Sequence, residues 1–266
     1  MVQSLERAFA VLESFRDREA QGITRIVEST GLPKTTVHRI VRTLTELGYL
    51  EQDPRTAEYR LGLRFLSLAR ASAGSLDLRR FAQSAMDALY VETGESVYLG
   101  VREGTAVVFI DEKVSLKPVR VGSSIGLRAP LHATAAGKAI LAHLPAAELD
   151  EILAGLELEA YTSNTVADKA ALRRELEAVR RNGYAVNDQE WVEDACYIAA
   201  PVLERPNAPV GALTVGAPAG RLPKARWDEV GEKVKRAAAL VSQALGGGRE
   251  TPAPFAAAHG KTGNEG

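Results

Sequence analysis

The 266-residue sequence predicts an α+β fold with two parts, a small helical unit and a larger unit with a largely antiparallel sheet. In the N-terminal quarter, three short amphipathic segments are separated by turn residues, and a strand-turn-strand pattern follows them. In the second half, strand-like segments occur as a meander and then as a pair, without regular alternation with helices. This order favours helices on the faces of an antiparallel sheet.

The composition is that of a globular protein without a metal site based on cysteine. Hydrophobic residues make up 45% and charged residues 25%, and the formal net charge is −1. One cysteine excludes an internal disulfide, and four histidines make a zinc site improbable. No apolar run approaches the ~20 residues of a membrane span, and residues 1–12 lack the pattern of a signal peptide. We therefore expect a cytoplasmic protein with no membrane contact, no metal ion and no cofactor.

Three helices are predicted in the N-terminal unit. Apolar residues at helical spacing predict the first over residues 4–16. The second runs from residue 24 to residue 30, and Gly31 is placed to end it. Pro33 suits the first turn of the third helix, where its missing N–H costs nothing, and Gly48 ends that helix.

A hairpin and a connecting helix follow, and the second unit begins near residue 76. The hairpin strands are predicted at residues 49–52 and 58–61, and the connecting helix at residues 63–73. In the second unit, strands are predicted at residues 96–102, 105–114, 117–121, 184–190, 197–204 and 209–217. Helices are predicted at residues 76–93, 146–154, 168–182 and 222–245, with a further helix starting near Thr134.

The order of these predicted elements also gives the boundaries of the parts. We expect a winged helix-turn-helix over residues 1–63, a linker helix over 64–75 and a second domain over 76–246. Residues 247–266 are rich in small and turn-forming residues without periodicity, and they are predicted to be disordered. Within the second domain, Asp168 is placed to cap the helix that begins there, and Gly183 to end it.

The second and third helices have the pattern of a helix-turn-helix. In this motif the later helix, here the third helix of the chain, enters the major groove of DNA. With its apolar stripe buried, this helix presents Thr35, Arg39 and Arg42 on one face, and no acidic residue interrupts residues 33–45. Arginine can bond guanine in a bidentate way, and free N–H groups at the helix start attract phosphate. The hairpin tip adds Arg55 as a wing contact. The predicted DNA-contacting residues are Lys34, Thr35, Thr36, His38, Arg39, Arg42 and Arg55.

Alternatives remain at this point. A basic amphipathic face can be merely solvated, but the ordered set of helices, glycine turn, basic stripe and hairpin is more specific to DNA binding. An enzyme with a DNA-binding head would need a convergent set of titratable groups in the second half, and the sequence has none with recognisable catalytic spacing. A protein-interaction module without a ligand is the third alternative.

The sequence resembles the IclR family of bacterial transcriptional regulators in several ordered segments. The N-terminal ones read GITRIVESTGLPKTTVHRIVRTLTELGYLEQD and YRLGLRFLSLA, with APLHATAAGKAILA at residues 129–142 and GYAVNDQEWVEDACYIAAPV at residues 183–202. The resemblance implies a ligand-responsive repressor or activator of catabolic genes that is not an enzyme. It also implies binding to double-stranded operator DNA as a homodimer or a dimer of dimers.

A pocket for a small-molecule effector is predicted around the helix that starts near Thr134. Small residues there could let a ligand approach backbone N–H groups, or could only allow close packing of the helix on the sheet. The resemblance favours a pocket for small organic acids or aromatic compounds. The effector-contacting positions that it implies are Val119, Val121, Ala135, Ala136, Asn187, Tyr197 and Thr214.

Two of these positions depart from the family pattern. Asn187 stands where the family usually has aspartate, which removes a charge and adds a donor. Tyr197 stands where cysteine or serine is typical, and it offers a ring and a phenol. We therefore expect an aromatic or amide-like effector; the alternative is that Tyr197 closes the pocket and is structural. Nearby, Lys138 and Glu190 are predicted to be solvated, and His132 is predicted to be structural.

Overall fold

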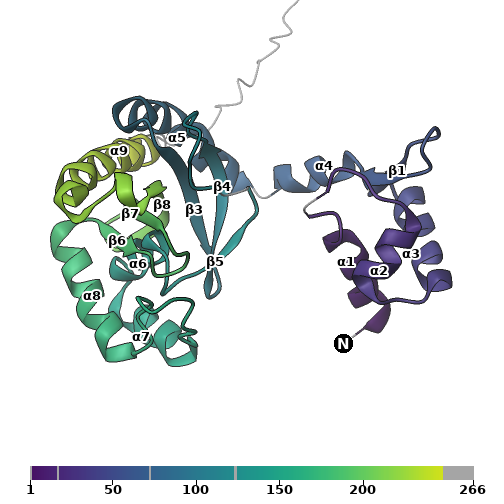
Figure 1. Cartoon of the computed structure of the whole chain (residues 1–266), viewed down its shortest axis with the longest axis horizontal. Helices are drawn as coiled ribbons and strands as arrows, with labels where there is room; N and C mark the ends of the chain where they lie inside the picture. The colour runs from purple at the N-terminus through teal and green to yellow at the C-terminus, as the bar shows by residue number, and fades with distance from the viewer. Residues whose placement is uncertain (1, 17, 72, 123–124, 248–266) are drawn as a thin grey trace, which may run out of the picture. The chain divides into compact units, whose positions relative to one another are not determined.

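The structure is a computed structural model that describes residues 2–16, 18–71, 73–122 and 125–247 (Figure 1). The chain separates into two compact units, Met1–Leu76 and Asp77–Gly266. The predicted disorder of residues 247–266 lies outside the described residues, except for Gly247, which ends the last helix. No helix in the described part of the chain is long and apolar enough to span a membrane.

The first unit is a winged helix-turn-helix, as predicted. Its apolar core is formed by Val11, Phe15, Ile26, Val37, Val41, Leu44 and Leu50. Gly31 adopts the left-handed φ of 66° that the tight turn between the second and third helices requires. The elements are α1 (Gln3–Glu13), α2 (Ile23–Thr30), α3 (Lys34–Glu46), β1 (Leu50–Gln52), β2 (Tyr59–Leu61) and α4 (Arg64–Ala71).

The second unit contains a six-stranded antiparallel sheet with the strand order β5-β4-β3-β8-β7-β6. The strands are β3 (Ser96–Glu103), β4 (Ala106–Lys113), β5 (Arg128–Pro130), β6 (Ala185–Asp188), β7 (Ala195–Arg205) and β8 (Ala208–Pro218). The helices are α5 (Ala73–Thr93), α6 (Ala135–Ala142), α7 (Ala146–Gly155), α8 (Lys169–Asn182) and α9 (Trp227–Gly247), with the 3-10 turns Ala219–Arg221 and Lys224–Arg226 before α9.

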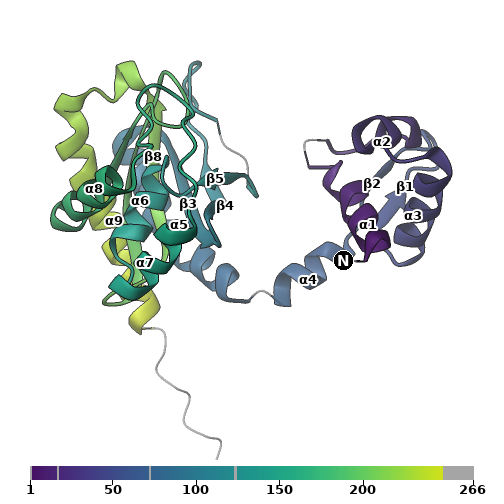
Figure 2. The ribbon, with the colours of Figure 1, turned by 90° about the horizontal axis from the view of Figure 1, so that it is seen from below.

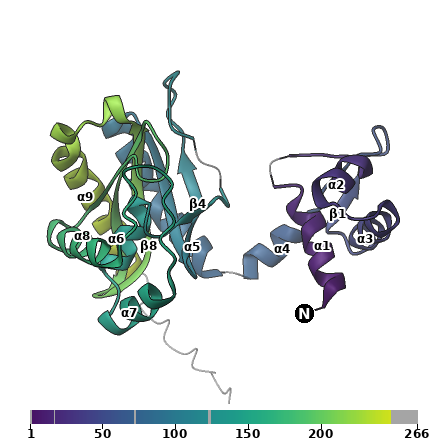
Figure 3. The ribbon, with the colours of Figure 1, turned by 60° about the horizontal axis from the view of Figure 1, so that its bottom comes forward.

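Helices cover both faces of this sheet, as Figures 2 and 3 show. Successive residues of a strand point to opposite faces, so Val97 and Leu99 of β3 join the core under α5 and α9. Tyr98, between them, joins the other core, which is formed with α6, α7 and α8. The fold is therefore α+β, and the alternation of β3 brings Tyr98 to the face where α6 begins.

The predicted strand at residues 117–121 is wrong. These residues form no strand, and β5 pairs with β4 in their place, with Ala106 opposite Pro130. Pro118 has no N–H for a ladder, and side chains bind the carbonyls of this segment instead. Arg221 donates to the Val119 carbonyl at 2.8 Å, and Tyr98 donates to the Val121 carbonyl at 2.9 Å.

Candidate functional site

The polar face of α3 and the hairpin form a groove of about 570 Å³. Four of the predicted DNA contacts line it, namely Thr35, His38, Arg39 and Arg42, together with Thr45, Glu46, Gln52 and Tyr59. Lys34, Thr36 and Arg55 lie outside the groove. Lys34 is exposed at the first position of α3, Thr36 is half-buried on another side of the helix, and Arg55 is exposed at the hairpin tip.

An acidic residue is also present on this surface, and it lies one position beyond the acid-free window of the sequence. Glu46 accepts a hydrogen bond from Arg42, with Nε 2.8 Å from Oε1, and both side chains are well exposed. Arg39 forms no ion pair with any residue that the structure describes. Of the two arginines on the stripe, Arg42 is therefore paired with Glu46, whereas Arg39 has no ion pair among the described residues.

The second candidate site is a pocket between the N-terminus of α6 and the sheet. It is lined by Tyr98, Phe109, Gly122, Thr134, Ala135, Ala136, Asn187, Trp191, Tyr197 and Thr214. Five predicted effector positions are therefore brought together, and two are not. Val119 is 67% exposed, and Val121 is buried without lining the pocket, although its carbonyl accepts the Tyr98 hydroxyl.

The first residues of α6 line the pocket, and side-chain contacts of Thr134 fix the start of this helix. The Thr134 side chain caps the helix by accepting from the Gly137 N–H at 3.1 Å, and it donates to the Pro130 carbonyl at 2.8 Å. A Cβ on Gly137 would lie 2.1 Å from the Leu131 carbonyl oxygen, so the helix can approach this closely only with glycine. Ala135 and Ala136 are the first helical residues, whose N–H groups have no acceptor within the helix.

A buried hydroxyl adds to these donors. The Thr214 side chain is 2% exposed, and its Oγ1 has no hydrogen-bond partner among the described residues. A buried hydroxyl without a partner is costly, and this one lines the same pocket as Ala135 and Ala136. The arrangement can bind a polar oxygen of a ligand, with a positive helix end favouring a negative charge.

Aromatic rings form the remaining wall. The ring centroids of Tyr98 and Phe109 are 5.7 Å apart. The Tyr197 ring lies against Gly216, where a Cβ would come within 2.6 Å of it. Burial raises the pKa of the Tyr98 and Tyr197 phenols, so both stay neutral at physiological pH. The enclosed space is about 20 Å³, which holds about one water molecule, so a ring-bearing ligand enters only if a wall side chain turns aside.

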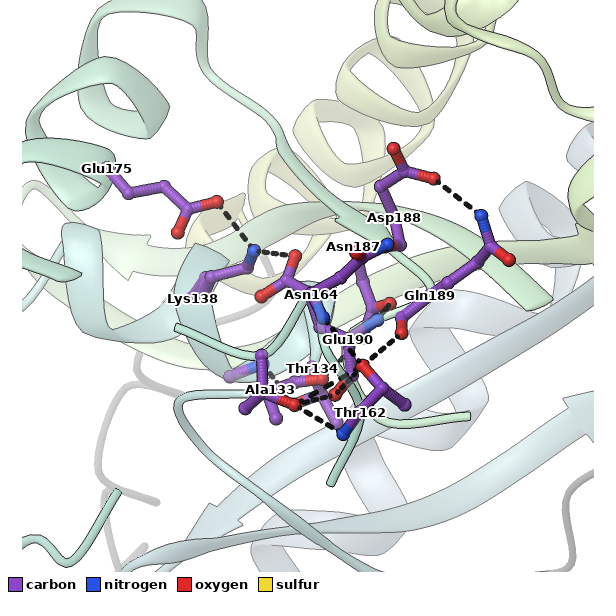
Figure 4. A network of polar contacts seen from close by, with 12 residues as sticks. Ala133, Thr134, Lys138, Thr162, Asn164, Glu175, Asn187, Asp188, Gln189 and Glu190 are labelled. Carbon is purple, nitrogen blue, oxygen red and sulfur yellow. Dashed lines mark hydrogen bonds and ion pairs between the residues drawn. The ribbon is translucent and has the colours of Figure 1, made fainter. Parts of the chain in front are cut away.

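Both polar groups of Asn187 are used inside the protein. Its Nδ2 donates to the Ala133 carbonyl, and its Oδ1 accepts from the Glu190 N–H at 3.0 Å (Figure 4). A carboxylate at this position could not donate to Ala133. Asn187 therefore joins the segment before α6 to the turn after β6.

Two polar residues near the pocket are not solvated as predicted. Lys138 is fully buried, and Glu190 is 5% exposed. Their side chains form an ion pair, with Nζ 2.6 Å from Oε1, and Glu175 of α8 is a second partner of Lys138. His132 is buried, and its Nε2 lies 2.9 Å from the Glu159 carbonyl oxygen, which gives it a structural contact.

Two family models match the chain. One describes the IclR helix-turn-helix domain and matches residues 4–54. The other describes the C-terminal part of bacterial transcriptional regulator IclR and matches residues 70–243. The chain is 34% identical over 248 residues to the HTH-type transcriptional regulator XynR of Escherichia coli (strain K12), covering 92% of this chain and 98% of that protein. It is 35% identical over 251 residues to the glycerol operon regulatory protein of Streptomyces coelicolor (strain ATCC BAA-471 / A3(2) / M145), covering 93% and 98%.

Solved structures agree with these matches. IclR of Thermotoga maritima superposes with a TM-score of 0.77 at 26% identity, covering 92% of this chain and 100% of that chain. An IclR homolog from Microbacterium hydrocarbonoxydans, solved in complex with 4-hydroxybenzoate, gives a TM-score of 0.78 at 30% identity, covering 91% and 98%. The resemblance found in the sequence is thereby confirmed. The chain belongs to the IclR family, whose members are DNA-binding, ligand-responsive transcriptional regulators and not enzymes.

Proposed function

We propose that the protein represses or activates genes of small-molecule catabolism in response to an aromatic or amide-like organic effector. The observation that carries this proposal is the pocket beside α6, which combines ring-bearing walls with the N–H groups of Ala135 and Ala136 and the unpartnered hydroxyl of Thr214. A ring with a carboxylate or an amide matches both features. Support also comes from the homolog solved with 4-hydroxybenzoate.

The proposed contacts follow from the two sites. We infer that DNA is contacted by Lys34, Thr35, Thr36, His38, Arg39, Arg42 and Arg55, and the effector by Ala135, Ala136, Asn187, Tyr197 and Thr214. The proposed domains are residues 1–63 for DNA, 64–75 as the linker and 76–246 for the effector. The separation of the compact units after Leu76 supports this division.

We also propose that the protein acts as a homodimer. An apolar groove of about 620 Å³ runs between α1, α3 and α4 in the first unit. Leu5 and Phe9 of α1 and Leu68 of α4 line it, and each is more than half exposed. Exposed apolar surface of this kind marks an interaction site. A second copy is a suitable occupant, because dimeric helix-turn-helix proteins read symmetric half-sites.

The regulatory function predicts binding to the DNA upstream of the protein's own gene. We expect the logarithm of the affinity to fall linearly with the logarithm of the salt concentration, because phosphate contacts release counterions. Adding 4-hydroxybenzoate should shift this affinity, because an effector that prefers one arrangement changes its population. Fluorescence anisotropy at several salt concentrations measures both effects, and light scattering gives the number of subunits. Salt-independent or absent binding would contradict the regulatory function.

Replacing Tyr197 with serine distinguishes a ligand-stacking tyrosine from a blocking one. If the ring stacks on the effector, Tyr197→Ser should weaken 4-hydroxybenzoate binding by about 0.5–1.5 kcal/mol, the contribution typical of an aromatic pair. Calorimetry on both proteins measures the difference, with pyruvate as the small aliphatic comparison. Tighter 4-hydroxybenzoate binding by the serine variant would show that Tyr197 closes the pocket. Binding of pyruvate alone by the wild-type protein would refute an aromatic effector.

A further inference from the structure

Three charged side chains form an ion network beside the pocket, in which Lys138 and Glu190 are buried and the Glu175 side chain is 31% exposed. Lys138 lies in α6, and its Nζ is 2.7 Å from Oε1 of Glu175 and 2.6 Å from Oε1 of Glu190 (Figure 4). The second carboxylate oxygen of each glutamate is buried and has no partner among the residues that the structure describes. Buried charges need such contacts to offset their lost hydration. The contacts of Lys138 therefore hold two distant segments in one place.

On one side, Lys138 is part of the helix that begins at the pocket. Its backbone N–H donates to the Thr134 carbonyl at 3.0 Å, which closes the first turn of α6. That turn contains Ala135 and Ala136, which line the pocket. The position of the Lys138 side chain is therefore tied to the position of the donors.

On the other side, Glu190 precedes Trp191, which lines the pocket. The backbone around Glu190 is held in one conformation. Its N–H donates to Asn187 Oδ1 at 3.0 Å, and its carbonyl accepts the Thr165 hydroxyl at 2.5 Å. Gln189 has a φ of 61°, which residues other than glycine adopt rarely. These contacts hold the backbone of the turn, and the ion pair with Lys138 attaches it to α6.

We propose that Lys138 and Glu190 are positioning residues for the effector, and this rests on the proposed function of the pocket. Their ion pair fixes the Trp191 wall relative to the α6 N-terminus, and so determines whether a flat ring with an acidic group fits between them. Glu175 contacts the same ammonium group from α8, but no residue of α8 lines the pocket. Glu175 therefore compensates charge without positioning the wall.

A matched pair of isosteric variants separates these roles, in a Trp227→Phe background where Trp191 is the sole tryptophan. Glu190→Gln and Glu175→Gln each remove one carboxylate charge from Lys138. In the folded protein without any ligand, we expect Glu190→Gln to shift the Trp191 emission to the red and to increase its quenching by acrylamide. Glu175→Gln should leave both unchanged. A purely structural contribution would move the denaturation midpoint of both variants and leave the emission of the folded state the same.

The second measurement uses 4-hydroxybenzoate as the probe in calorimetry. We expect Glu190→Gln to weaken its binding about tenfold, which equals about 1.4 kcal/mol, and Glu175→Gln to leave the affinity within experimental error. Equal effects of the two variants, or an unchanged Trp191 emission in Glu190→Gln, would overturn the proposal. Lack of 4-hydroxybenzoate binding by the wild-type protein would contradict the aromatic effector, and the emission measurement would still decide the role of the ion pair.

Discussion

Replacing Lys138 with methionine should lower the free energy of unfolding of the effector-binding unit by about 3–5 kcal/mol. Methionine matches the length of the lysine stem, so the main change is the loss of the ammonium group. Glu190, which is 5% exposed, and Glu175 are then left facing each other without their shared cation. Urea unfolding followed by tryptophan emission measures the loss. The two tryptophans, Trp191 and Trp227, both lie in this unit, so the signal reports on it alone.

The control for this prediction is another lysine changed in the same way. Lys235 pairs with Glu232 on α9 at 2.5 Å and also donates to the Asn182 carbonyl at 3.3 Å, and the two side chains of the pair are 40% and 52% exposed. Because exposed pairs contribute little, Lys235→Met should cost less than about 1 kcal/mol. Adding Glu190→Gln to Lys138→Met removes one of the uncompensated charges and should recover part of the loss. A loss for Lys138→Met no larger than that for Lys235→Met would contradict the buried ion network.

The loss of unfolding free energy in Lys138→Met should depend on pH, and the titration of Glu190 determines the direction of this dependence. Burial raises the pKa of Glu190 above its ordinary value of 4.5; Lys138 opposes this increase, and the charge of Glu175 adds to it. A raised pKa means that the folded state binds the proton more tightly than the unfolded state does. The resulting stability is present below pH 4.5 and is lost as the pH rises through the raised pKa. Without Lys138 the pKa rises further, so the difference between variant and wild type should be largest near neutral pH and shrink towards pH 4.5 and below.

Helix ends could be predicted from the sequence because they depend on a few neighbouring residues. Gly31 ends α2 with a left-handed φ, and its N–H donates to the Val27 carbonyl at 2.9 Å. Asp168 caps α8 by accepting from the Ala171 N–H at 2.7 Å, and Gly183 ends it with a φ of 81°. These local contacts follow from capping rules that apply to any helix.

The environment of Lys138 could not be predicted in this way. A lysine in a helix is ordinarily solvated, and its two partners lie 37 and 52 positions further along the chain. Only the packing of α8 and of the turn after β6 against α6 brings them together. Of the rings in the pocket wall, Tyr197 was predicted, but Tyr98, Phe109 and Trp191 were missed for the same reason, because they reach the pocket from two strands and a turn.

The segment at residues 117–121 shows a different limit. Its alternating apolar residues match a strand, but an exposed edge of the sheet can accept only one partner. β5 occupies that edge beside β4, and Arg221, more than 100 positions away, takes the Val119 carbonyl. Tertiary contacts determine which of the two strand-like segments pairs with β4, and a local sequence pattern does not reveal those contacts.

Replacing Arg39 with alanine should weaken binding to the specific DNA site by about 1–3 kcal/mol and relax its preference at one base pair. Arg39 lies on the exposed face of α3 in the groove shared with the hairpin, where a guanidinium can reach a guanine edge. Arg39 forms no ion pair within the described residues, so the substitution breaks no ion pair inside the protein. The measured loss of affinity then reports the contact with DNA. Anisotropy titrations on the upstream DNA and on single-base variants measure both effects.

Three companion variants make this prediction specific. Arg55→Ala at the hairpin tip should weaken binding to all sequences alike and reduce the salt slope by about one, as expected for a phosphate contact. Glu46→Gln should strengthen binding, because it releases Arg42 from its 2.8 Å ion pair and removes a negative charge from the surface that faces DNA. Arg236→Ala, on α9 of the effector-binding unit, is the matched control and should leave DNA binding unchanged. If Arg39→Ala and Arg236→Ala have the same effect, α3 does not read DNA through Arg39. Binding by the Glu46→Gln variant then tests whether Arg42, one turn further along α3, is the side chain that reads DNA.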